Sequence, residues 1–170
     1  AQASTADRAR LAEMASKYDW AAADLRTQIR GARLMEEHGY TDERIAIARA
    51  IMARRDLDED VFFNQAMTLN FLLRDNKKYP DAAMEVLRAA EERLKNNKNL
   101  RAKINREIGD VFYYYKADLD RALLEYDKVV GRYSGLEDNI VRVTKIKIGD
   151  IFRERGQLQK ASELYEEAEK

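Results

Sequence analysis

The stretch Ile-Gly-Asp-Val-Phe at residues 108–112 recurs as Ile-Gly-Asp-Ile-Phe at residues 148–152, which is 40 residues further along the chain. The same position recurs upstream at a step of 39 residues, as Gly31, Asn70 and Gly109. A fixed step of roughly 20–50 residues is the mark of stacked-repeat architectures. Because such a unit cannot bury its apolar side alone, the chain is expected to form one stack of related units.

Each unit continues with a second set of residues at the same step, which indicates a second helix. The small residues of this set are Ala83, Ala122 and Ala161. Four residues after each come Leu87, Tyr126 and Tyr165, a helical spacing. A Gly inside a helix costs about 0.8–1 kcal/mol relative to Ala, so its repetition predicts a close contact between the paired helices. We expect Gly109 to lie opposite Ala122, and Gly149 opposite Ala161.

These two units, at residues 108–129 and 148–168, resemble tetratricopeptide repeats. They carry the family's order of an apolar residue, Gly, an aromatic residue three later, and then Ala, an aromatic and a small residue on the second helix. Two upstream copies are weaker, because Asn70 replaces the Gly in one and Arg30 and Arg44 replace an apolar and a small residue in the other. The resemblance implies an all-α fold of antiparallel helix hairpins stacked as a right-handed superhelix. The family's usual unit is about 34 residues, so longer helices or turns are expected here.

No Pro-, Gly- or Ser-rich linker divides the chain, so we predict a single domain over residues 1–170. An extra N-terminal helix is expected within residues 1–19. Four repeats are expected to follow, at about 20–59, 60–98, 99–137 and 138–170.

Charge and composition limit the classes of partner. Lys plus Arg and Asp plus Glu both number 31, so the net charge is zero and the chain lacks the positive field that drives nucleic-acid binding. No apolar run approaches the roughly 18 residues that a membrane span needs, so we expect no direct membrane insertion. The absence of Cys and the opening Ala1-Gln2-Ala3 favour a bacterial periplasmic or secreted setting, while a cytoplasmic one stays open.

Candidate catalytic and metal-binding residues are few. His38 is the only His and is expected to cap a helix rather than bind zinc, because zinc proteases place a second His four residues away. Asp56, Asp58 and Asp60 begin like a calcium loop, but Val61 and Met67 stand where that loop needs Gly and Glu, so we interpret them as helix-capping residues. We expect no enzyme activity, no cofactor and no metal.

Tyr113-Tyr114-Tyr115 is the most distinctive local feature. Three successive helical residues span about 300° of arc, so at least one Tyr should be exposed or packed in a groove. The tyrosines are expected either to fill space between repeats or to anchor a bound partner.

The resemblance implies that the first helices line a concave groove that takes a peptide or protein segment. By position, the groove residues are expected to be Met67, Phe71, Arg74, Arg106, Asp110, Tyr113, Asp150 and Arg153, with Gln28, Ala32, Met35 and Ile146 at the matching places. The function is therefore expected to be that of an interaction scaffold.

Two alternatives stay open. The first alternative to a scaffold is a self-assembling structural element of a larger, envelope-associated complex. The second is an accessory domain of an enzyme encoded further along the same gene. Because no helix follows Ala161, Leu164, Tyr165 and Ala168, we also expect that the parent protein continues or that the C-terminal end face packs on another copy.

Overall fold

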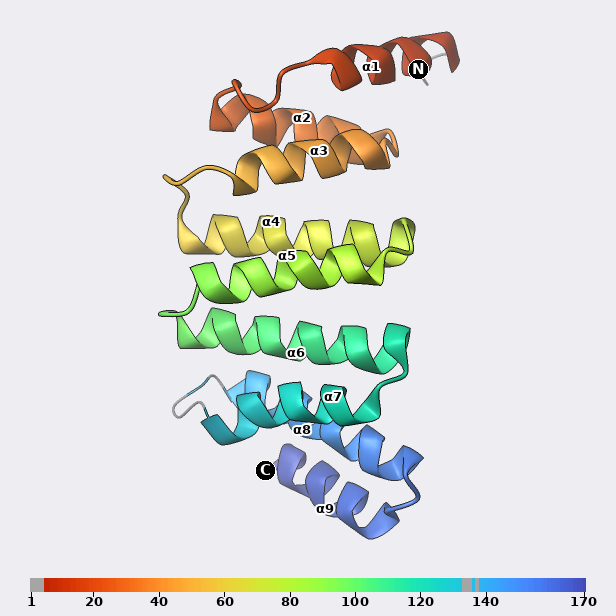
Figure 1. Cartoon of the computed structure of the whole chain (residues 1–170), viewed down its shortest axis with the longest axis vertical. Helices are drawn as coiled ribbons and strands as arrows, with labels where there is room; N and C mark the ends of the chain where they lie inside the picture. Colours follow the sequence, from red (N-terminus) through yellow and green to blue (C-terminus); the bar gives the residue numbers. More distant parts are fainter. Residues whose placement is uncertain (1–4, 133–135, 137) are drawn as a thin grey trace. The chain divides into compact units, whose positions relative to one another are not determined.

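A computed structural model describes residues 5–132, 136 and 138–170, and these are all-helical, without strands. They form nine α-helices, two of which continue as short π-helical turns (Figure 1). The elements are α1 (Thr5–Lys17), α2 (Leu25–Glu37), α3 (Thr41–Met52), α4 (Glu59–Phe71), η1 (Leu72–Asn76), α5 (Pro80–Arg93), α6 (Lys98–Lys116), α7 (Leu119–Asp127), η2 (Lys128–Arg132), α8 (Asp138–Glu154) and α9 (Leu158–Glu169). The expected fold class, all-α, is confirmed.

The chain divides into two compact units. Unit 1 comprises Ala1–Ala83 and unit 2 comprises Met84–Lys170, so the boundary falls inside α5. The single domain and the four repeat boundaries inferred from the sequence stay predictions.

In unit 1, α2 and α3 form a helix hairpin, and α1 and α4 both contact α3. The core of this hairpin joins Met35 of α2, Ile47 and Ile51 of α3, and Ala15 of α1. The Trp20 indole lies against Gly31, where any Cβ would collide with the ring, and its Nε1 donates to the Ala15 carbonyl at 2.9 Å. The segment from α1 to Trp20, which we call the N-terminal segment, is therefore part of this core.

In unit 2, α6 pairs with α7 and α8 pairs with α9. A Cβ on Gly109 would lie 2.6 Å from Cδ1 of Tyr126, and one on Gly149 would lie 3.0 Å from Cδ1 of Tyr165. Gly109 and Gly149 therefore each make room for a Tyr ring of the second helix. The ring one turn beyond Ala122 or Ala161 is the side chain nearest to each of these glycines, and the expected place of the two alanines opposite them stays a prediction.

The helix ends follow the expected capping chemistry. His38 is the C-cap of α2, as predicted, and Gly39 follows with φ +74°, a left-handed conformation that Gly adopts without steric cost. Tyr40 N donates to Met35 O at 2.8 Å, which closes the helix end. Asp58 caps α4 by accepting from Asp60 N at 2.8 Å, so the capping interpretation is confirmed for Asp58, whereas Asp56 pairs with Arg54 at 3.0 Å.

Candidate functional site

In unit 2, the repeated Gly-Asp pair forms a polar contact beside the buried Tyr ring. The Tyr126 hydroxyl donates to Asp110 Oδ1 at 2.5 Å, and Tyr165 donates to Asp150 Oδ1 at 2.9 Å. Asp110 also receives Lys147 Nζ of α8 at 2.8 Å, so its carboxylate links α6, α7 and α8. Burial, followed by the charge of Asp110, raises the pKa of the Tyr126 hydroxyl, which keeps the proton that this hydrogen bond needs.

Beside this contact, tyrosines of α6 meet charged residues of α8. The Tyr113 hydroxyl donates to Glu154 Oε1, and burial together with this carboxylate raises the Tyr113 pKa. Tyr114 packs edge-on against Tyr113 with centroids 4.6 Å apart, and Lys147 Nζ lies 5.5 Å from the Tyr114 ring centroid. Tyr114 is nevertheless 60% exposed, which confirms that at least one Tyr of the run faces outward.

We call Tyr113, Tyr114, Lys147, Asp150 and Glu154 the tyrosine face. Two exposed side chains of α8, Ile146 and Arg153, lie within the same stretch of that helix. Arg153 pairs with Asp150 at 3.0 Å. Surfaces of this kind, with an exposed aromatic ring among charges of both signs, offer contact area at low entropic cost.

Of the groove residues expected in unit 2, the structure brings Asp110, Tyr113, Asp150 and Arg153 together on α6 and α8. Asp110 is buried and its carboxylate is already engaged, whereas Arg153 is exposed. Arg106 is half-buried and lies 4.0 Å from the Glu107 carboxylate.

Of those expected in unit 1, Phe71 is 50% exposed, Met67 is half-buried, and Arg74 pairs with Asp75 at 2.9 Å. Phe71 lines a hollow of about 190 Å³ with residues from the α2–α3 turn and η1. The lining residues are Met35, Glu36, Gly39, Tyr40, Thr41, Arg44, Thr68, Phe71, Leu72 and Asn76.

Arg44 of α3 is the unusual residue of this hollow, because it is only 6% exposed. Its two Nη atoms lie 3.4 and 3.5 Å from Gln65 Oε1, and its Nε lies 3.9 Å from the exposed carboxylate of Glu36. Burial lowers the pKa of the Arg44 guanidinium, and the charge of Glu36 offsets part of this effect. These contacts are long for a buried cation.

The first hairpin does not offer the expected groove residues. Gln28, Ala32 and Met35 are 0%, 4% and 1% exposed, because the N-terminal segment and α3 cover them. Trp20 O accepts from Gln28 Nε2 at 2.7 Å, which ties this segment to α2. The expectation that these three residues line an open surface was wrong.

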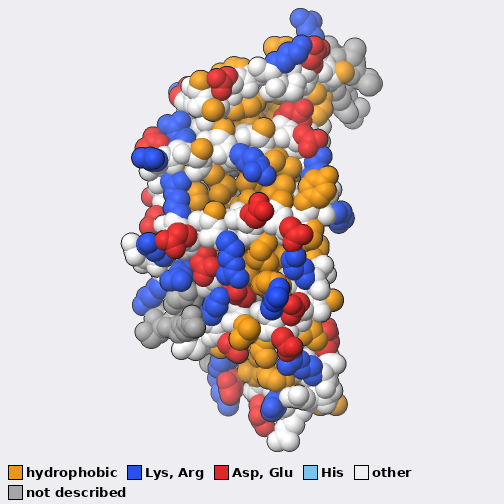
Figure 2. Space-filling view, in the orientation of Figure 1, with side chains coloured by type: hydrophobic (Ala, Val, Ile, Leu, Met, Phe, Trp, Pro, Cys, Tyr) orange, Lys and Arg blue, Asp and Glu red, His pale blue; other side chains and the backbone are white. Residues whose placement is uncertain are grey.

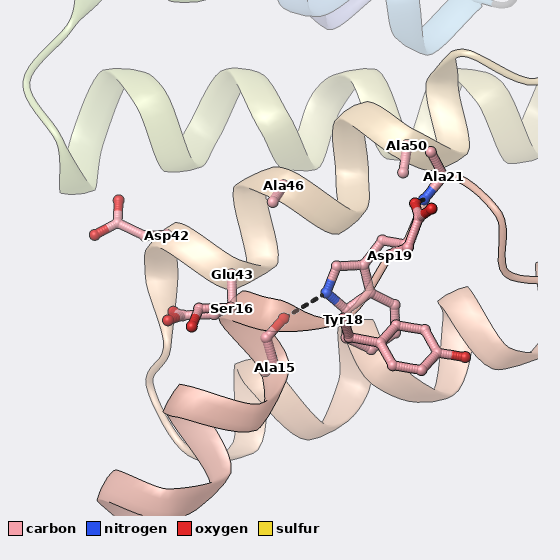
Figure 3. Close-up of a pocket in the computed structure, with 10 residues that line it drawn as sticks. Ala15, Ser16, Tyr18, Asp19, Ala21, Asp42, Glu43, Ala46 and Ala50 are labelled. Carbon is pink, nitrogen blue, oxygen red and sulfur yellow. Dashed lines mark hydrogen bonds between the residues drawn. The ribbon is translucent and has the colours of Figure 1, made fainter.

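A second, larger hollow of about 490 Å³ lies between the N-terminal segment and α3 (Figure 3). Ala46 and Ala50 of α3 line it, and Asp42 and Glu43 line it at the start of the same helix. Tyr18 packs on Trp20 at its edge, with ring centroids 4.6 Å apart. The hollow has small apolar walls and an acidic rim, and Asp42 already pairs with Lys77 at 2.6 Å.

The described residues contain no group of three or more His, Asp or Glu side chains arranged to hold a metal ion. None of the helices in the described ranges has the length and apolar character of a membrane span.

Sequence reasoning missed three residues of these surfaces. Lys147 and Glu154 lie 37 and 41 residues from their α6 partners, so their charges could have been paired with Asp110 and Tyr113 through the repeat step. Arg44 stands at the repeat position that holds Ala83, Ala122 and Ala161, so its place in the repeat step could have indicated its burial.

Comparisons with known proteins do not place the chain in a family. No family model matches it, and no curated protein matches its sequence. The crystal structure of BtubC (BKLC) from P. vanneervenii aligns with a TM-score of 0.40 and 17% identity, covering 96% of this chain and 87% of that one. Nothing about the present chain follows from a similarity at this level.

Proposed function

We propose that this chain is a protein-interaction module without catalytic activity, in which the first helices of a tetratricopeptide-like right-handed superhelix bind an extended protein segment. The observation that supports this most directly is the exposure of large aromatic side chains on first helices. Phe71 on α4 is 50% exposed and Tyr114 on α6 is 60% exposed. Leaving such rings in water forgoes the free energy of burying them, and exposed aromatic residues are enriched where partners bind.

The charges around the tyrosine face bear on the chemistry of the segment. Lys147 and Arg153 stand beside Asp150 and Glu154, so neither sign dominates. On the face drawn in Figure 2, the lower part of the molecule shows apolar side chains between charges of both signs. A segment with an apolar anchor for Tyr114 and alternating charges would complement this arrangement.

The test compares matched surface truncations in a pull-down from native extract. Phe71→Ala and Tyr114→Ala remove exposed rings from first helices, whereas the control Leu124→Ala removes a side chain that is 63% exposed on α7. We expect the captured partner to be lost with the first two variants and kept with the control. Equal capture by all three contradicts the proposal, and oligomers in light scattering of the chain alone would favour the self-assembly alternative.

A further inference from the structure

Arg44 stands where the other helix pairs carry a small residue. At the 39-residue step, its equivalents are Ala83, Ala122 and Ala161, all of which are buried. Small side chains at this position let helices approach closely. A buried Arg here occupies far more volume, and the hollow between the α2–α3 turn and the end of α4 lies directly beside it.

The guanidinium in this hollow has unused hydrogen-bonding capacity. An Arg carries five N–H donors, and burial without acceptors is costly. Gln65 accepts only at 3.4 and 3.5 Å, and Nε has no hydrogen-bond acceptor among the described residues. The nearest carboxylate, Glu36, remains 75% exposed and 3.9 Å away. Arg44 is thus a desolvated cation that lacks a close anionic partner.

The rest of the hollow is mainly apolar. Met35, Tyr40 and Leu72 form its walls together with the half-exposed Phe71 ring, and Thr41 and Thr68 add hydroxyl groups. Its volume of about 190 Å³ suits one side chain and part of its neighbour. The hollow therefore combines a buried positive charge with an aromatic edge.

We propose that this hollow holds an acidic side chain of a bound segment, whose carboxylate pairs with Arg44 while the adjacent apolar residue packs on Phe71. The inference rests on the proposed function, since it names the chemistry of the segment that unit 1 receives. Arg is suited to this task because its planar fork matches a carboxylate, and the pair gains strength where water is excluded.

Glu36 has a defined part in this arrangement. Its carboxylate faces the same guanidinium, so it competes with the incoming acid and weakens its binding. Glu36→Gln removes this competition, and we expect tighter binding of an acidic peptide by that variant.

The experiment titrates the ¹⁵N-labelled chain with two acetylated and amidated peptides, Ala-Leu-Glu-Leu-Ala and Ala-Leu-Gln-Leu-Ala. We expect the Glu peptide to shift the Arg44 Nε–Hε resonance and the backbone amides of Thr41 and Phe71. The Gln peptide should bind about tenfold or more weakly, because it lacks the charge that completes the pair. Equal shifts with both peptides, or no movement of the Arg44 side-chain signal, overturn the inference.

Variants separate this site from the rest of the surface. Arg44→Met keeps an apolar stem of similar length and should abolish the preference for Glu over Gln, and Arg44→Lys should retain only part of it. If Arg44→Met does not fold, the peptide pair on the unmodified chain decides alone. If the chain responds equally to the two peptides but Tyr114→Ala still loses the partner in the pull-down, this inference alone is overturned. If Tyr114→Ala keeps the partner, the proposed function is contradicted.

Discussion

Gly109 and Tyr126 are packed so closely that a Cβ on the glycine would lie 2.6 Å from Cδ1 of the ring. The hydroxyl on the same ring donates a hydrogen bond to the carboxylate of Asp110, the residue after the glycine. The Tyr126 side chain of α7 therefore contacts two successive residues of α6, because its ring packs on Gly109 and its hydroxyl binds Asp110. Gly149-Asp150 and Tyr165 repeat the arrangement.

Gly109→Ala should destabilise the chain although Ala is the better helix former. Tyr126 is 1% exposed, so its ring has nowhere to move. Overpacking costs about 1–3 kcal/mol and Ala returns about 1 kcal/mol of helix propensity, and because the Tyr126 ring is enclosed we expect the upper end of the difference, a net loss of about 2 kcal/mol. Gly149→Ala is the matched comparison, with a loss below about 1 kcal/mol, because Tyr165 is half-buried and its ring can shift toward solvent. Urea unfolding of both variants measures the difference, and equal losses would contradict this reasoning.

Tyr126→Phe keeps the ring against Gly109 and removes only the hydroxyl. Asp110 then loses its donor on α7 but retains Lys147 at 2.8 Å. A hydrogen bond to a charged group contributes about 1.5–3 kcal/mol, and we expect a loss in the lower half of this range because Lys147 remains. Chemical denaturation checks the value, and an unchanged unfolding free energy would show that the Tyr126–Asp110 contact contributes nothing.

The raised pKa of Tyr126 predicts a loss of stability at alkaline pH. Below about pH 10 the hydroxyl stays protonated in both the folded and the unfolded chain, so its contribution is complete. As the pH rises further, only the unfolded chain releases this proton, and stability falls by up to about 1.4 kcal/mol per pH unit until the folded-state pKa is reached. The stability difference between the unmodified chain and Tyr126→Phe should therefore shrink above about pH 10. A difference that stays constant with pH would contradict the assignment.

Gly31→Ala should displace Trp20, because the new methyl group would occupy the position of the indole ring. Trp20 is the only Trp, so its fluorescence reports this contact directly. We expect a red-shifted emission and faster proteolysis within the N-terminal segment, whereas Arg33→Ala, an exposed substitution on the same helix, should leave both unchanged. Unaltered emission from Gly31→Ala would show that the ring does not depend on this glycine.

The helices themselves were predictable because the apolar spacing and the capping residues agree. Pro80 begins α5, Asp118 caps α7, and His38 and Gly39 end α2, and each residue type is typical of its place at a helix end. These signals are local, so they act wherever the helix finally packs. The π-helical turns at Leu72–Asn76 and Lys128–Arg132 have no comparable local signature.

The contacts between helices were less predictable, since they depend on the length of each side chain as well as on its position in the sequence. Gly31 and Gly109 occupy equivalent positions at the repeat step, yet Gly31 contacts Trp20, which precedes α2, while Gly109 contacts Tyr126 of α7. The burial of Gln28 and Met35 has the same origin, because the N-terminal segment covers a hairpin that the repeat pattern alone leaves open.

The apolar residues expected to form a C-terminal end face belong partly to the interior. Ala161 and Ala168 of α9 are buried, and α9 packs on α8. Ser162, Glu163 and Glu166 are exposed on α9, which gives it a largely polar surface. Association through this end stays a prediction, with Leu158 as the large exposed apolar residue of α9.

Site-specific photo-crosslinking tests the central claim, that first helices carry the binding surface, most directly. A benzophenone amino acid replaces Tyr114 on α6 in one protein and Leu124 on α7 in another, two positions of similar exposure, 60% and 63%. The account predicts that irradiation in native extract yields one discrete adduct from position 114, competed by excess unmodified chain, and none of comparable yield from position 124. The same adduct at equal yield from both positions, or from position 124 alone, would contradict it.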